Sequence, residues 1–305
     1  MAANLWKYVD SNKRKSIFFI SFFVIFVVGL GILFSYAYDS SIILIIAVLI
    51  AIVQAFIGFY GGDSIILSIS GAKEIKKSDN PLLYRTVENL AITAGLPMPK
   101  VYIIDDPAPN AFATGRDPKH ASVAATTGLL RVLEKTELEG VIAHELSHIG
   151  NYDIRLTMII AILVSVVALL SDLFLRSRLF GLGRSRDENG GNQTGALIAI
   201  LAIVAAILAP IVAMVIQLAI SRKREFLADA DGALLTRYPE GLAGALEKIA
   251  KYREPVEHAS SATAHLYFAN PLKGNKQEES FFGKILSTHP PIQERISLLR
   301  DLEIR

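Results

Sequence analysis

Two uninterrupted apolar segments near the N-terminus constrain this chain more than any other feature. Residues 16–36 read SIFFISFFVIFVVGLGILFSY, and residues 41–60 read SIILIIAVLIAIVQAFIGFY. Each is long enough to cross about 30 Å of hydrocarbon as a helix. The link at residues 37–40 predicts a tight hairpin between them. A basic cluster precedes the first segment, as in a signal peptide, but the segment is long and a second one follows at once, so we expect no cleavage.

Two further apolar segments, residues 156–175 and 196–220, interrupt an otherwise ordinary soluble sequence. The whole chain of 305 residues is 52% hydrophobic and 20% charged, and its mean hydropathy is +0.41. These values are too apolar for a typical soluble domain and too polar for a bundle of spans alone. We therefore predict four parts: an N-terminal transmembrane hairpin (1–68), the first part of a soluble domain (69–155), a second transmembrane or membrane-embedded hairpin (156–220), and the rest of that domain (221–305).

The bulk composition excludes several classes of function. The formal net charge is only +2, so electrostatics gives no support for a nucleic-acid partner. The chain has no cysteine, which excludes a cysteine nucleophile, thiolate metal ligands and disulfides. A transporter would carry ionisable residues deep in its spans, and the few polar candidates (Gln54, Asp172 and Gln217) give that class little support.

The soluble segments have the patterns of an α+β domain. Residues 81–95 predict a helix that Gly95 closes, residues 100–106 predict a strand, and residues 121–130 predict a second strand that leads into a turn. Residues 136–150 predict another helix, with Thr136 and Glu139 as a capping box at its start and Gly150 as the cap at its end.

This last helix carries the sequence HELSH at residues 144–148. Residues four apart share one face of a helix, so His144 and His148 can bind a single metal ion. Glu145 is rotated about 100° from His144 and can take a proton from a metal-bound water. The alternative is a chance match or a structural histidine pair, since this pattern arises by accident in on the order of one chain in a hundred of this length.

A third ligand is expected elsewhere in the chain, and the segment SRKREFLADAD at residues 221–231 is the best candidate. Glu225 can ligate the metal, and Asp229 can accept the second N–H of a ligand histidine. The alternative is a solvated, charged helix end at the membrane surface. Two apolar segments separate Glu225 from His148, which keeps both on the same side of the membrane.

Taken in order, four motifs resemble the HtpX-like membrane zinc metallopeptidases, which are relatives of the CAAX prenyl protease. The motifs are PNAFATG (109–115), HELSH (144–148), SRKREFLAD (221–229) and THPPIQERI (288–296). The four apolar segments match the same family. The resemblance implies a mainly α integral membrane protein, with four apolar helices and a zincin-like α+β metallopeptidase domain that contains a small edge-strand sheet.

The resemblance also implies roles for individual residues. One zinc ion per chain is expected on His144, His148 and Glu225, with Glu145 as the base and Asp229 in support of a ligand. His289 and Arg295 are expected to stabilise the oxyanion. An edge strand is expected to pair with an extended peptide substrate, and its residues are Asn110, Ala111, Phe112, Ala113, Thr114 and Gly115.

Other polar residues near these motifs receive simpler interpretations. Asn151 and Asp153 follow the HELSH helix, and we expect them to support the site by closing that helix with capping bonds. His120, His258 and His265 have no partner pattern, and we expect them at the surface.

Lys and Arg residues flanking the apolar segments predict the orientation. Basic residues precede the first segment and follow the second and fourth, which places the N-terminus and the catalytic domain in the cytoplasm, at the inner membrane. Four arginines between the third and fourth segments oppose this arrangement, so residues 156–220 either cross the membrane or lie in it as an embedded hairpin. The arginines are Arg176, Arg178, Arg184 and Arg186.

The function implied is a zinc endopeptidase that hydrolyses damaged or misfolded membrane proteins at the cytoplasmic face, as part of a stress response. Polypeptides and the lipid bilayer are its expected partners, and the sequence leaves the oligomeric state open. Two alternatives stay open, namely a peptidase that processes prenylated proteins and a zinc-stabilised membrane scaffold without catalysis.

Overall fold

The computed structural model describes residues 2–37, 40–162, 222–252, 254–257, 259, 263–271 and 290–302. The third and fourth apolar segments are described only as far as residue 162, where residues 153–162 are helical. Their course as a hairpin therefore lies outside the described residues, and so do His258 and His289.

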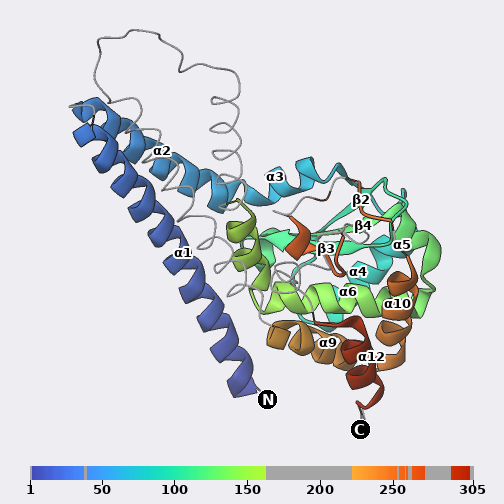
Figure 1. Ribbon diagram of the computed structural model, residues 1–305. Coiled ribbons are helices and arrows are strands. Elements are labelled where there is room, and N and C mark those ends of the chain that lie inside the picture. Colours follow the sequence, from blue (N-terminus) through green and yellow to red (C-terminus); the bar gives the residue numbers. More distant parts are fainter. Residues whose placement is uncertain are drawn as a thin grey trace.

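The two N-terminal apolar segments form the expected pair of helices. Helix α1 spans Ala2–Ala37, and helix α2 spans Ser41–Tyr60. The two helices lie side by side and project from the rest of the molecule (Figure 1). Large apolar side chains face outward along both, among them Ile25 at 71% exposure and Phe56 at 63%.

Helix α3, Gly62–Ile69, continues the chain after a sharp bend at Gly61. By length and composition, no helix among the described residues is sufficient on its own to cross a membrane. The bent pair formed by Leu44–Tyr60 and Gly62–Ile69, which meet at 73°, does meet the requirement together.

A four-stranded sheet forms one layer of the compact domain. Its strands have the order β1-β2-β4-β3, with β2 and β4 parallel and the other neighbours antiparallel. Strand β3 is therefore at an edge, as the family resemblance implies for this segment. The strands are β1 (Ala72–Glu74), β2 (Lys100–Ile104), β3 (Ala111–Gly115) and β4 (Ala121–Thr126).

Two of these strands differ from the prediction. Strand β4 leads into the short helix α5, Thr127–Val132, rather than into a turn, because the Thr126 hydroxyl accepts a hydrogen bond from Leu129 N (3.1 Å) and caps this helix. Strand β1 was not predicted, since three residues are too few to show an alternating pattern.

Helix α6, Lys135–Gly150, carries the HELSH sequence through the middle of the domain. It runs between the sheet and helix α9 (Figure 1), and it contacts α4, α9, α10 and β3. Its interior positions Val141, Ile142 and Leu146 are at most 1% exposed. The surrounding helices are α4 (Pro81–Thr93), α9 (Arg222–Thr236), α10 (Pro239–Lys251) and α12 (Ile292–Arg300).

Both ends of α6 differ from the predicted caps. The helix starts one residue before Thr136, and Glu137 rather than Glu139 accepts the hydrogen bond from the cap residue, Glu134 N (2.7 Å). At the other end Gly150 is the last helical residue, and the left-handed conformation falls on Tyr152, with φ of 59°. The C-cap itself is Asn151, whose N–H donates to Ser147 O (2.9 Å).

Candidate active site

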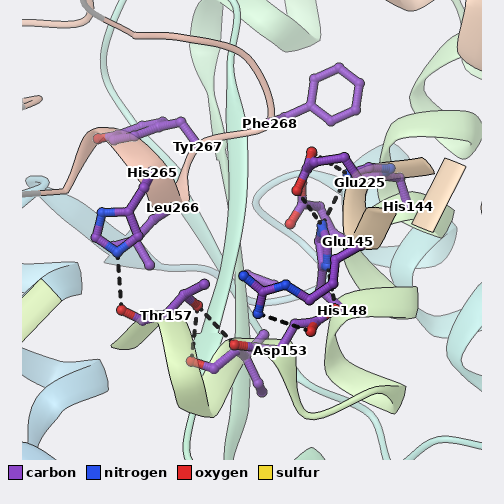
Figure 2. A pocket seen from close by; sticks show the side chains of 13 residues that line it. His144, Glu145, His148, Asp153, Thr157, Glu225, His265, Leu266, Tyr267 and Phe268 are labelled. Atoms are coloured by element: carbon purple, nitrogen blue, oxygen red, sulfur yellow. Dashed lines mark hydrogen bonds and ion pairs between the residues drawn. The ribbon is translucent and has the colours of Figure 1, made fainter. Parts of the chain in front are cut away.

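Three side chains from two helices come together at the centre of the domain. His144 and His148 project from one face of α6, and Glu225 projects from the first turn of α9 (Figure 2). One nitrogen or oxygen atom of each lies within 4.8 Å of the others, which could hold a metal ion. The Glu225 carboxylate is 3.8 Å from His144 Nε2 and 3.7 Å from His148 Nε2.

The close crossing of α6 and α9 depends on a glycine. A Cβ atom at Gly232 of α9 would lie 2.9 Å from the backbone nitrogen of His144. Such a contact is too short for any other residue without moving one helix. Gly232 therefore allows the two helices to approach closely enough for Glu225 to reach the histidines.

Asp229 fixes the orientation of the first histidine. It lies one turn after Glu225 on α9, and its Oδ1 atom is 2.9 Å from His144 Nδ1. Because the Nδ1–H group donates a hydrogen bond to this carboxylate, Nε2 of His144 is left with its lone pair toward Glu225. Asp229 also accepts two hydrogen bonds from Arg295, from Nε (2.8 Å) and Nη2 (2.6 Å).

Asp153 has the corresponding place beside the second histidine. Its Oδ2 atom is 3.0 Å from His148 Nδ1, and its Oδ1 atom accepts from Arg224 Nη1 (3.3 Å). The expected capping role is therefore wrong for Asp153, because the turn at Tyr152 directs its carboxylate back to the histidine face. The Asn151 side chain bonds instead to Ser147 Oγ and Asp231 Oδ2, both at 3.2 Å.

Arg295 lies on the Asp229 side of His144, and its Nη1 atom is 3.8 Å from the Glu225 carboxylate. Its side chain is 0% exposed, and it donates to Asp229 and to the carbonyl of Phe268 (3.2 Å). The guanidinium does not line the pocket in front of the histidines. The hydrogen bonds to Asp229 and Phe268 hold the guanidinium in place, and the oxyanion role expected for Arg295 stays a prediction.

Glu145 is buried beside the histidines at the wall of the pocket, with 2% of its surface exposed. Burial raises the pKa of Glu145 to about 7. This effect of burial is larger than the opposing effects of His148 and of the hydrogen bond from the Ala113 N–H, which lower the pKa. A carboxyl group with this pKa can accept and return a proton near neutral pH.

The two histidines have opposite electrostatic environments. Burial lowers the pKa of His144 to about 4, so its imidazole is neutral. Burial also lowers the pKa of His148, but the hydrogen bond to Asp153 and the charge of Glu225 outweigh this effect and raise it to about 9. The surroundings of His148 thus favour positive charge, which is the environment that a cation needs.

Strand β3 runs past these residues at the free edge of the sheet. Alternate residues of an antiparallel edge strand direct their backbone groups outward, and here these are Ala111, Ala113 and Gly115. Ala111 O accepts from Phe268 N (2.8 Å), and the Asn110 amide exchanges two hydrogen bonds with the backbone of Ala269 (2.9 and 3.2 Å). The chain itself therefore covers the first part of the predicted substrate strand, while Ala113 faces the pocket.

Gly115 ends this strand in a conformation that suits only glycine. Its φ is 140°, and a Cβ atom would lie 2.2 Å from the carbonyl oxygen of His120. The backbone groups of Phe112 and Thr114 pair with β4. Among the described residues, the part of the edge left for a peptide is therefore Ala113–Gly115, apart from the Ala113 N–H, which donates to Glu145.

One of the other histidines was placed wrongly from the sequence. His265 is only 5% exposed, lines the pocket, and lies with Nε2 3.1 Å from Thr157 O (Figure 2). It follows a polar stretch without periodicity, so no local pattern indicated its burial. His120 is exposed as expected and pairs with Asp117 at 2.7 Å.

A histidine pair on one helix, a glutamate from a second helix and a buried glutamate beside a sheet edge together define the site of a metallopeptidase. The sequence pattern of peptidase family M48 matches residues 77–303, and the chain belongs to this family. The resemblance inferred from the motifs is thereby confirmed.

Several similar proteins support this assignment. A "Protease HtpX homolog" from Tropheryma whipplei (strain TW08/27) is 47% identical over 298 residues, which cover 98% of each chain. One from Dictyoglomus turgidum is 47% identical over 294 residues, covering 96% of this chain and 93% of the relative. The crystal structure of S. mikatae Ste24p, at 17% identity, has a similar fold with a TM-score of 0.52, over 97% of this chain and 67% of that one.

Proposed function

We propose that this chain is a membrane-bound, zinc-dependent endopeptidase that hydrolyses damaged or misfolded membrane proteins at the cytoplasmic face of the inner membrane. The observation that carries the proposal is the convergence of His144, His148 and Glu225 next to the buried Glu145. Membership of a peptidase family supports the same reaction.

Zinc fits the donor set better than other common divalent ions. Two imidazole nitrogens and one carboxylate are a ligand set of catalytic zinc, which keeps a further position for water or substrate. The neutral His144 and the anionic surroundings of His148 suit such a cation. When bound, the metal lowers the pKa of a coordinated water and polarises the substrate carbonyl.

The proposed role of Glu145 is to move the proton. It accepts the proton of the attacking water and then delivers it to the amine that leaves the cleaved peptide bond. A pKa of about 7 makes both transfers feasible. Asp229 and Asp153 keep the two histidines in the tautomers that direct Nε2 to the ion.

The proposed substrate is an extended peptide that adds to the open part of the β3 edge. Ala113 and Gly115 offer outward-facing backbone groups next to the pocket, and main-chain hydrogen bonds to such an edge accept many sequences. This broad acceptance suits an enzyme that removes damaged proteins. The role of His289 in stabilising the oxyanion stays a prediction.

The membrane location is supported by the apolar hairpin and its flanking charges. Helices α1 and α2 expose large apolar side chains along their length, which suits a lipid environment. The basic residues before the first apolar segment and after the second favour the cytoplasmic side for the domain. Whether residues 156–220 form a hairpin that crosses the bilayer or lies embedded in it stays a prediction.

The experiment that tests this function compares two glutamates on the same helix. Glu145→Gln should abolish nearly all cleavage of a casein substrate by the detergent-purified chain, because the carboxamide cannot accept the proton. Glu139→Gln, which changes a partly exposed residue paired with Lys135, should leave cleavage unchanged. Full activity of Glu145→Gln would contradict the mechanism, and cleavage restricted to prenylated peptides would favour the processing alternative.

A further inference from the structure

Helix α1 makes a buried polar contact with the residues around the candidate metal site. The contact comes from Asn12, which is 2% exposed and lies four residues before the apolar segment begins. Its Nδ2 atom donates to Asp153 Oδ1 (2.7 Å) and to the carbonyl of Asn151 (3.0 Å). Both N–H groups of the amide are therefore used on the turn that follows α6.

The two oxygens of Asp153 have different partners. Oδ2 is bonded to His148 Nδ1, while Oδ1 accepts from Asn12 and from Arg224 of α9. A carboxylate held at one oxygen has only one orientation in which the other oxygen reaches the imidazole. Asn12, which makes the shorter of the two contacts, thus helps Arg224 to fix where the hydrogen-bond acceptor of His148 lies.

The turn itself needs support from outside. Tyr152 has a φ of 59°, which is unfavourable for a bulky residue and persists only where the surroundings hold it. Lys13, the next residue on α1, places its ammonium group 4.4 Å from the centre of the Tyr152 ring. Two consecutive residues of α1 therefore contact the same turn.

We propose that Asn12 is a positioning residue for His148, so that the N-terminal helix forms part of the metal site. This inference rests on the proposed function, because it takes His148 as a zinc ligand. A buried amide is costly unless its hydrogen bonds are satisfied, and here they are satisfied only while α1 is docked on the domain. Docking of the apolar hairpin and tight binding of zinc should therefore depend on each other.

The test measures zinc affinity in the full-length, detergent-purified chain by competition with a chromophoric chelator. Asn12→Ala should weaken zinc binding by about 3- to 10-fold, the change in affinity that corresponds to one net hydrogen bond. Removing a carboxylate that itself bonds a ligand histidine should weaken zinc binding more. The visible spectrum of the cobalt-loaded chain should change as well, because the orientation of one ligand changes.

Ser16→Ala provides the matched control. Ser16 is also 2% exposed and lies one turn later on α1, but its hydroxyl donates to Asn12 O of its own helix (2.9 Å). This variant should keep the zinc affinity and the cobalt spectrum of the wild type. Equal weakening in both variants would mean that α1 acts only through general packing, and the inference would be wrong.

Exchanging the side chains of Asn12 and Asp153 gives a second test, which can be used even if the Asn12→Ala chain folds poorly. Asn12→Asp alone places two carboxylates together and should weaken zinc binding more than Asn12→Ala does. Adding Asp153→Asn places an amide N–H donor opposite the residue-12 carboxylate and keeps an oxygen that can accept from His148 Nδ1, so it should recover part of the affinity. No recovery would overturn the inference.

The wild type separates this inference from the proposed function. A wild-type chain that binds no zinc would overturn both. A wild-type chain that binds zinc, together with an Asn12→Ala chain of equal affinity and identical cobalt spectrum, would overturn only the role of Asn12.

Discussion

At the scale of single residues, the candidate site depends on two buried carboxylates that bond the outer nitrogens of the histidines. One of them is Asp229, which connects His144 to the fully buried Arg295. A buried charge of this kind is tolerated only while its partner is present. Arg295 therefore acts through Asp229, and its contribution should appear in stability as well as in activity.

Arg295→Met should lower the stability of the chain by about 3–5 kcal/mol, because it leaves the Asp229 carboxylate buried without its partner. The control is Arg300→Met on the same helix, where an exposed guanidinium pairs with Glu240 and Glu247 at the surface. We expect little change there, since solvent screens surface ion pairs. Thermal denaturation of both purified variants checks this, and equal shifts would contradict it.

At the scale of elements, the site exists because α6 and α9 cross without an intervening side chain. The crossing point is Gly232 against the backbone of His144. A methyl group there must push the helices apart, and overpacking of this kind typically costs about 1–3 kcal/mol.

Gly232→Ala should therefore move Glu225 away from the histidines and weaken zinc binding as well as stability. Gly150→Ala, in the last turn of α6, is the control, because its new methyl group would meet only Leu96 Cδ2 at 3.9 Å. That variant should bind zinc normally and be no less stable, since alanine favours a helix over glycine. Chelator competition measures the zinc affinity of both variants. Normal zinc affinity in Gly232→Ala would contradict the packing argument.

The elements near the site differ in how far the sequence could predict them. The HELSH helix follows from helical periodicity and its end signals. The edge position of β3 and the approach of Glu225 to the histidines were predicted from the family resemblance of short motifs. The contact of Asp153 with His148 could not be predicted, because it depends on the left-handed conformation of Tyr152. The contact between Asn12 and Asp153 could not be predicted either, because the two residues are 141 positions apart and no local pattern relates them.

At the scale of the whole molecule, an apolar hairpin projects from a compact peptidase domain, and α1 passes beside that domain before it joins α2 (Figure 1). The proposed orientation places the domain in the cytoplasm and the short link between α1 and α2 outside. The absence of cysteine makes this testable, because any introduced thiol is unique in the chain.

We expect Ser40→Cys, in the link between the helices, to react with a membrane-impermeant maleimide in intact cells. Ser78→Cys, in an exposed turn of the domain, should react only after the cells are made permeable. The two sites lie on opposite sides of the membrane in the proposed arrangement. Labelling of Ser78→Cys in intact cells would contradict the cytoplasmic location.

The central claim is that His144, His148 and Glu225 bind one zinc ion, and metal analysis of the purified full-length chain tests it most directly. We predict one zinc per chain in the wild type and in Glu145→Gln, which keeps all three ligands. Glu225→Ala should retain much less zinc, because a ligand is lost. A full complement of zinc in Glu225→Ala, or none in the wild type, would contradict the account.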